Sequence, residues 1–303
     1  MSDSFIHPES SQSERISSYF LSLALVLFSY LMLGQFPLLI RLALQKGGLS
    51  ANDGADVHQL IHVLGKNATL LYLILPFVFA FITLLLSVRF IHKRPFLSLF
   101  TIRKHFDWKR FFITFSIWGI ILAFFLFLIS QITGKVLWNF NAQSFLPLLV
   151  ISILLIPIQT TCEELLFRGY LMQFSGKLLT KGWMVVVFTG VLFGLVHGAN
   201  PEVAALGYSV LIYYIFTGIF LGVLTLFDDG IELSMGYHAV NNIFSALIIT
   251  NDWQAFQTDA LFKDYNPPSF GWESILTIIF LQPVLVYTFS KLYRWKDMRK
   301  KLF

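Results

Sequence analysis

Long apolar segments recur along almost the whole sequence, and they constrain the fold more than any other feature. A helix needs about 20 apolar residues to cross the hydrocarbon core of a bilayer. Eight segments are candidates for such helices: Ser18–Leu44, Ala68–Phe90, Phe111–Ile132, Phe145–Cys162, Met184–Val196, Val203–Phe227, Ser234–Thr250 and Gly271–Tyr293. The fourth, fifth and seventh are short, which is typical of helices covered by neighbouring helices. The sequence therefore predicts an all-α, polytopic membrane bundle of about eight transmembrane helices.

The scarcity of charge supports this fold class. Only 13% of the 303 residues are charged and 56% are hydrophobic, whereas soluble domains average about 25% charged residues. The polar, Ser-rich residues 1–17 are predicted to form a disordered N-terminal tail. We divide the rest into N-terminal helices over 18–132, a core over 145–250, and a C-terminal helix with a basic tail over 271–303. The single cysteine allows no internal disulfide.

Two clusters of basic residues predict the orientation of the chain. One lies between positions 89 and 110 and the other follows position 290, each with a single aspartate. Basic loops remain on the cytoplasmic side of a membrane, and the six candidate helices between the clusters keep the two assignments consistent. We therefore expect a multi-pass protein of the cell membrane with both termini cytoplasmic. The acidic loop 227–233 fits this side less well. Nucleic acid is not expected as a partner, because the basic clusters flank membrane spans.

Three charges directly follow the fourth apolar segment, in "TTCEELLFRGY" at 160–170. Successive helical residues point about 100° apart, so the two glutamates cannot face one direction. Glu164 and Arg168 are four residues apart and can pair on one face. Glu163 is then predicted to have no partner in its own helix, which suits a general base. The alternative is a charge cluster that caps the helix or meets lipid headgroups.

Two histidines lie in or directly after later apolar segments. His197 is adjacent to a stripe formed by Gly190, Gly194 and Gly198. Small residues at this spacing allow close helix packing in membranes, so His197 is expected to face a neighbouring helix. A turn at 176–182 would place His197 and the paired glutamates at a similar depth, about 25 Å from the turn at 1.5 Å per residue.

The second histidine belongs to "MGYHAVNN", where His238 and Asn242 are four residues apart and share one helix face. Their side chains can donate hydrogen bonds toward one point. The alternative interpretation of either histidine is a packing residue with satisfied hydrogen bonds. His58 and His62 form an HxxxH pair in an outside loop, but they lack the glutamate of an HExxH zinc motif.

Three motifs in this order resemble one family. EExxxR begins at Glu163, FxxxH ends at His197, and HxxxN spans His238 to Asn242. Together they resemble the CAAX protease and bacteriocin-processing enzymes, also called the Abi family, over roughly residues 145–250. The resemblance implies an all-helical intramembrane endopeptidase. It implies that Glu163 and His197 activate a water, and that His238 and Asn242 form the oxyanion hole.

The resemblance also implies that Glu164 and Arg168 hold the catalytic residues in place without contacting the substrate themselves. No cofactor is expected, although Glu, His and His are zinc-type ligands and a zinc protease is the alternative. The implied partners are membrane lipids and a peptide or protein substrate, with prenylated tails as one class of target. Two other function classes stay open: a non-proteolytic immunity or scaffold protein of the same family, and a transporter in which buried Glu and His relay protons.

Overall fold

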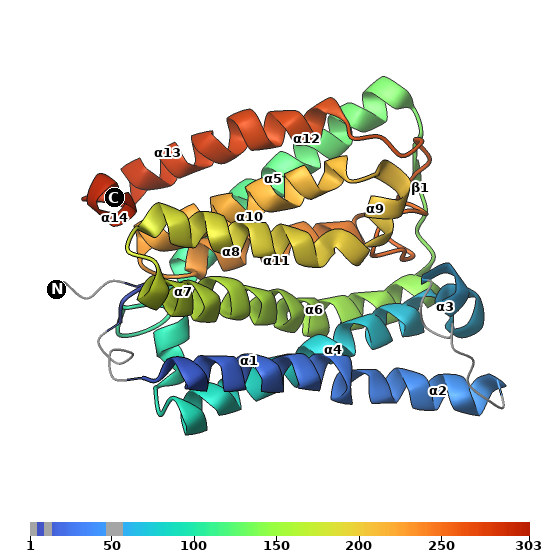
Figure 1. Cartoon of the computed structure of the whole chain (residues 1–303). Coiled ribbons are helices and arrows are strands. Elements are labelled where there is room, and N and C mark those ends of the chain that lie inside the picture. The colour runs from blue at the N-terminus through green and yellow to red at the C-terminus, as the bar shows by residue number, and fades with distance from the viewer. Residues whose placement is uncertain (1–4, 9–13, 47–56) are drawn as a thin grey trace.

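The computed structural model describes residues 5–8, 14–46 and 57–303, and they form a helical bundle (Figure 1). Seven helical segments among the described residues are long and apolar enough to cross a membrane. These segments are Ile16–Gln45, Lys66–Ile91, Trp108–Thr133, Ala142–Leu178, Gly182–Ala199, Ser209–Asp228 and Trp272–Leu292. The predicted all-α membrane fold is confirmed. The predicted span Ser234–Thr250 is a more polar helix of 16 residues, α11.

In the labels used below, α marks an α-helix, η a short 3₁₀ or π-helix, and β a strand. The elements follow one another along the chain in this order: α1 Ile16–Leu31, η2 Leu33–Gln35, α2 Phe36–Lys46, α3 Val57–Leu64, α4 Lys66–Leu86, η3 Ser87–Ile91, η4 Phe96–Leu99, α5 Trp108–Thr133, β1 Val136–Trp138, α6 Ala142–Glu164, η5 Leu165–Leu171, α7 Met172–Leu178, α8 Gly182–Val196, η6 His197–Ala199, α9 Pro201–Leu206, α10 Ser209–Asp228, α11 Glu232–Leu247, β2 Ile249–Thr250, β3 Phe262–Asp264, α12 Trp272–Leu276, η7 Thr277–Leu281, α13 Gln282–Leu292 and α14 Met298–Leu302.

The helix α6 occupies the middle of the bundle (Figure 1). It packs against α4 on one side and α11 on the other, while α8 packs on α10 and α11 packs on α5. The outer helical segments α1 and η7 present large apolar side chains to the surroundings, such as Phe28 at 55% and Ile279 at 71% exposure. Such exposure is expected where lipid covers the surface. The central position of α6 keeps polar groups on it away from that surface.

The glycine stripe on α8 acts largely as predicted. A side chain added at Gly190 or Gly194 would lie 2.7 or 2.8 Å from a backbone nitrogen of α10. Both positions therefore require glycine for the close approach of the two helices. Gly198 differs, because nothing lies within 4 Å of an added Cβ. The predicted stripe is wrong at that position, since Gly198 lies in η6, beyond the end of α8.

Several predicted boundaries are wrong. The segment Val203–Phe227 is not one helix: Gly207, with φ +74°, separates α9 from α10. The helix that begins at Ala142 is much longer than Phe145–Cys162, because it continues through the π-helix η5 into α7. Three short strands were not predicted. They form a sheet in the order β1-β3-β2, with β1 antiparallel and β2 parallel to β3.

Part of the predicted N-terminal tail packs on the bundle. Phe5 and Ile6 are buried, and Glu14 pairs with Arg94 at 3.0 Å and with His92 at 3.2 Å. Burial alone would raise the pKa of Glu14, but hydrogen bonds from His92 and Tyr19 and the charge of Arg94 hold that pKa below its ordinary value. These residues are therefore ordered, unlike the disordered tail expected over 1–17. Residues 1–4 and 9–13 of that tail lie outside the described residues.

The acidic segment 227–233 pairs with two arginines of the first basic cluster. Asp228 pairs with Arg103 and Arg110, each at 3.0 Å, and Glu232 pairs with Arg103 at 3.2 Å. This pairing explains why acidic residues are tolerated in a loop predicted to lie on the basic side.

The same loop joins the two ends of the chain. Asp229 forms an ion pair with Lys301 near the C-terminus, and it accepts a hydrogen bond from the backbone N–H of Phe5. Both ends of the chain therefore lie at one end of the bundle (Figure 1). The assignment of that end to the cytoplasm stays a prediction.

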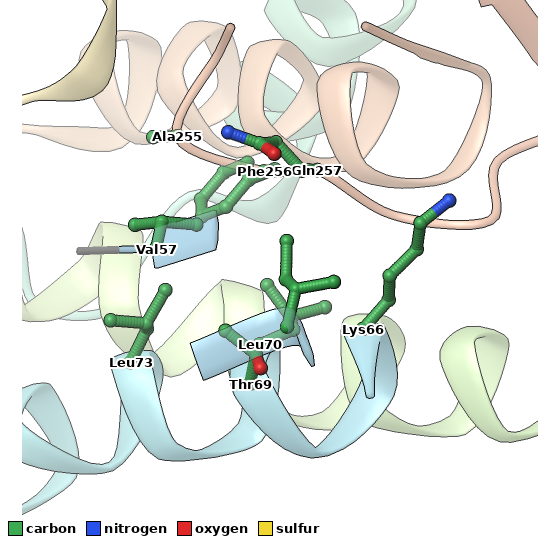
Figure 2. Close-up of a pocket in the computed structure, with 9 residues that line it drawn as sticks. Val57, Lys66, Thr69, Leu70, Leu73, Ala255, Phe256 and Gln257 are labelled. Carbon is green, nitrogen blue, oxygen red and sulfur yellow. The ribbon is translucent and has the colours of Figure 1, made fainter. Parts of the chain in front are cut away.

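The opposite end of the bundle holds a small pocket between α3, α4 and residues 255–257 (Figure 2). Val57, Thr69, Leu73 and Phe256 are among its lining side chains, and the amine of Lys66 lies at its edge. None of the residues that the motifs single out contributes to it.

Candidate active site

The paired glutamates lie at the end of α6, well inside the continuous helical segment Ala142–Leu178. The helix changes from α to π geometry at Leu165, directly after them. Short π segments inside α-helices are frequent at functional sites. The helix thus presents Glu163 and Glu164 in the interior of the bundle, where both lie against His238 of α11.

Glu164 and Arg168 form the predicted pair. The guanidinium donates to Oε1 of Glu164 at 3.0 Å, and the two side chains are 0% and 1% exposed. Arg168 also donates to the carbonyl of Gly218 on α10 at 3.3 Å, and its guanidinium carbon lies 4.1 Å from the ring centre of Phe193. The pair is therefore fixed by contacts with both α8 and α10.

Glu163 has a partner in its own helix, so the prediction that it has none is wrong. The amide nitrogen of Gln159 donates to Oε1 of Glu163. The two residues are four apart, which places them one above the other on the helix. The other carboxylate oxygen, Oε2, lies 3.7 Å from Nε2 of His238. One oxygen of Glu163 is thus held by its own helix while the other faces α11.

His238 lies between the two glutamates. Its Nδ1 is 2.7 Å from Oε1 of Glu164. An ionised carboxylate only accepts hydrogen bonds, so Nδ1 carries the hydrogen. Nε2 then carries a lone pair and accepts hydrogen bonds in the neutral ring, whereas in the imidazolium it carries a hydrogen and donates. His238 is an oxyanion donor through Nε2 only when it carries the second proton.

Asn242 lies one turn after His238 on α11, and both side chains face α6. Its amide nitrogen donates to Oε1 of Gln159 at 3.0 Å. Asn242 is therefore connected to Glu163 through Gln159. His238 and Asn242 therefore share one face of α11, as predicted. His238 lies next to Glu163 directly, whereas Asn242 is connected to it through Gln159.

His197 lies at the end of α8, in the short 3₁₀ segment η6. Its Nδ1 is 2.7 Å from the carbonyl oxygen of Phe193, so this nitrogen carries the hydrogen and Nε2 holds the lone pair. The ring stacks on Tyr214 of α10, at 4.3 Å between centres and 22° between planes. His197 therefore faces a neighbouring helix, as the glycine stripe predicts.

The ring of Phe193 lies between the two histidines, at 4.6 Å from His197 and 5.9 Å from His238. None of the hydrogen bonds found within the described chain joins His197 to Glu163. The structure thus joins Glu163 and Asn242 through hydrogen bonds to Gln159, and it places Nε2 of His238 3.7 Å from Glu163. His197 lies next to this group, in contact with the ring of Phe193. Within the described ranges, no three His, Cys, Asp or Glu side chains are grouped closely enough to hold a metal ion.

Exposure separates the two glutamates further. The side chains of Glu163 and His238 are 11% and 8% exposed, whereas Glu164 is fully buried. A molecule that reaches this site from outside would therefore meet Glu163 and His238 before the buried pair.

Sequence reasoning missed two residues that contact this group. Gln159 bonds both Glu163 and Asn242, and Tyr214 stacks on His197. A signal for Gln159 was available, because it is a polar residue in an apolar run, four residues before Glu163. Tyr214 has no comparable signal, because its contact depends on how α8 and α10 pack.

The fold and the site define a class: a polytopic helical membrane protein with a carboxylate, imidazole and amide group inside its bundle. Residues 142–244 match the family model described as "Type II CAAX prenyl endopeptidase Rce1-like". All three sequence motifs lie in this segment. This segment is thus similar to the family that the motifs resemble.

A curated relative is similar over a longer stretch. The "Uncharacterized protein YyaK" of Bacillus subtilis (strain 168) is 37% identical over 181 residues, which cover 57% of this chain and 59% of the relative. The similarity thus spans less than two thirds of the length of that protein. No solved structure matches the chain.

Proposed function

We propose that this chain is an intramembrane endopeptidase that hydrolyses a peptide bond near the cytoplasmic face of the cell membrane. The substrate class is a membrane-anchored peptide or protein, with CAAX-type prenylated tails as one candidate. The family match supports the protease class at the level of the family. The cytoplasmic location rests on the two basic clusters, because residues of both pair with the same segment, Asp228–Asp229.

In this proposal Glu163 is the general base. Its Oε2 accepts a proton from a water molecule, and the resulting hydroxide adds to the carbonyl carbon of the scissile bond. His197, with its Nε2 lone pair, assists in binding and orienting that water. The proton then moves from Glu163 to the departing amine, which breaks the C–N bond. Positioned acid–base groups of this kind contribute about 100- to 10,000-fold in rate.

The negative charge that develops on the carbonyl oxygen needs donors. His238 in its imidazolium form donates through Nε2, and Asn242 donates through its amide nitrogen. Donors fixed in advance toward an oxyanion are each worth about 100- to 1000-fold in kcat. Glu164 and Arg168 hold the ring of His238 from its Nδ1 side, so its orientation does not depend on the substrate.

One observation carries the proposal. The facing atoms of Glu163 and His238 are 3.7 Å apart, and their side chains keep 11% and 8% exposure, whereas the Glu164–Arg168 pair behind them is 0% and 1% exposed. A base and an oxyanion donor are thereby adjacent at the accessible side of the site. We propose that no metal is required, because Gln159 already holds Oε1 of Glu163 and Glu164 already holds Nδ1 of His238, so protein contacts orient both groups.

The test is cleavage by the purified full chain in lipid vesicles. A library of membrane-anchored peptides, prenylated and unmodified, is incubated with wild type and Glu163→Gln, and products are identified by mass spectrometry. We expect wild type to cleave a subset and Glu163→Gln to cleave none while unfolding at the wild-type temperature. No cleavage by wild type, together with cellular function that survives Glu163→Gln, would instead indicate the scaffold class.

A further inference from the structure

A chain of side-chain hydrogen bonds leads from α5 through α11 to Glu163 on α6. The indole N–H of Trp118 donates to Asn241 at 3.4 Å, and the amide of Asn241 donates to Asn242 at 3.5 Å. Asn242 donates to Gln159 at 3.0 Å, and Gln159 donates to Glu163. Every donor in this series points toward Glu163. The first two bonds are long, so the links through Gln159 matter most.

The direction of these bonds follows from the two ends of the series. An indole N–H only donates, and an ionised carboxylate only accepts. The amide of Gln159 must therefore turn its nitrogen to Glu163 and its oxygen to Asn242. Asn242 in turn must present its nitrogen to Gln159. The amide orientations are set by these partners, which removes the usual ambiguity of Asn and Gln side chains.

We propose that Gln159 is a positioning residue for hydrolysis, an inference that rests on the proposed function. Gln159 holds Oε1 of Glu163, which leaves Oε2, next to Nε2 of His238, as the oxygen that receives the proton of water. It also orients the amide nitrogen of Asn242, so the second N–H of that nitrogen is available to the oxyanion. A single buried side chain, 5% exposed, thus aligns the base and an oxyanion donor.

The first test compares two glutamines on the same continuous helical segment. Gln159→Leu removes both bonds, and Gln173→Leu is the matched control. Gln173 is also buried, donates to Ser98 at 2.7 Å and accepts from Arg94 at 2.9 Å. We expect Gln159→Leu to lower kcat about 10- to 100-fold with a small change in KM, because a misplacement of about 1 Å can cost about 100-fold. Gln173→Leu should lower stability and leave kcat within about twofold of wild type. Equal losses of kcat in the two variants would overturn the proposal.

The second test uses the pH profile of Gln159→Glu. A carboxylic acid can replace the amide only when protonated, because it then donates to Glu163 and still accepts from Asn242. When both carboxyl groups are ionised they repel each other. We expect the activity of Gln159→Glu relative to wild type to increase as pH falls. A ratio that is constant with pH would show that Gln159 acts only as packing.

The third test needs no substrate, so it separates this inference from the proposed function. The carboxylate stretching band of Glu163 is identified by difference infrared spectroscopy between wild type and Glu163→Gln. We expect the band to shift in Gln159→Leu and not in Gln173→Leu, because only the first variant removes a donor from Glu163. An unchanged band in Gln159→Leu would refute the inference whatever the activity. A shifted band without any proteolysis by wild type would refute the proposed function alone.

Discussion

Replacing Glu164 by Gln tests whether the two glutamates have different roles, with Glu163 as the base and Glu164 as the partner of Arg168. The variant removes the charge that faces the guanidinium of Arg168 while leaving the size of the side chain unchanged. Breaking a buried pair by removing one partner costs about 3–5 kcal/mol, because it leaves an uncompensated charge. Arg168 keeps its bond to the carbonyl of Gly218 and its contact with the ring of Phe193. We therefore expect a loss near the lower end, about 3 kcal/mol of the free energy of unfolding.

The assay is equilibrium unfolding of the full chain in mixed detergent micelles, with Asp259→Asn as the control. Asp259 pairs with Lys66 at 2.8 Å, but the two side chains are 27% and 29% exposed. Exposed pairs contribute about 0–1 kcal/mol, so the control should unfold almost as wild type does. Losses of the same size in the two variants would refute the claim that Glu164 compensates a buried charge. A stable Glu164→Gln with full activity would remove Glu164 from the site altogether.

Three further predictions concern rate, pH and topology. Asn242→Ala should slow cleavage about 100- to 1000-fold without abolishing it, since one oxyanion donor is lost; a rate equal to wild type in single-turnover assays would contradict this role. Glu14 has its pKa held below the ordinary value in the folded state, so its stabilisation is present above about pH 4.3 and is lost as pH falls through the folded-state value. Glu14→Gln should flatten the stability profile in that acidic range, and an unchanged slope there would exclude the effect. Reporters fused at Phe303 and inserted in 251–270 should report opposite sides of the membrane, with Phe303 cytoplasmic; the same side for both would refute the topology.

Local spacing rules predicted the part of the site that lies within single helices. The pair Glu164–Arg168 follows from four-residue spacing, and so does the shared face of His238 and Asn242. These relations depend only on helix geometry, which any packing preserves. The same spacing accounts for the bond between Gln159 and Glu163, which are also four residues apart.

Relations between distant segments could not be predicted in the same way. The sheet pairs Val136 with Asp264, which are far apart in the sequence, and each strand has only two or three residues. Such short strands carry no usable periodicity. The contact between His197 and Tyr214 depends on the register of α8 against α10, which the glycine stripe indicates but does not fix.

The break between α9 and α10 could not be predicted from the sequence either. Gly207 lies inside an apolar run, and its left-handed backbone separates α9 from α10. An isolated glycine in an apolar segment is compatible with a continuous transmembrane helix, so composition gave no reason to divide the segment there.

The account depends most on Glu163 acting as the base without a metal ion. The most direct measurement is the initial rate of peptide cleavage by purified wild type before and after chelation, with metal content determined on the same samples and Glu163→Gln as the inactive reference. The account predicts an unchanged wild-type rate after chelation, less than one metal ion per ten chains, and no cleavage by Glu163→Gln. One zinc ion per chain, lost together with activity on chelation and restored with it, would contradict the account and assign the hydrolysis to a metalloprotease.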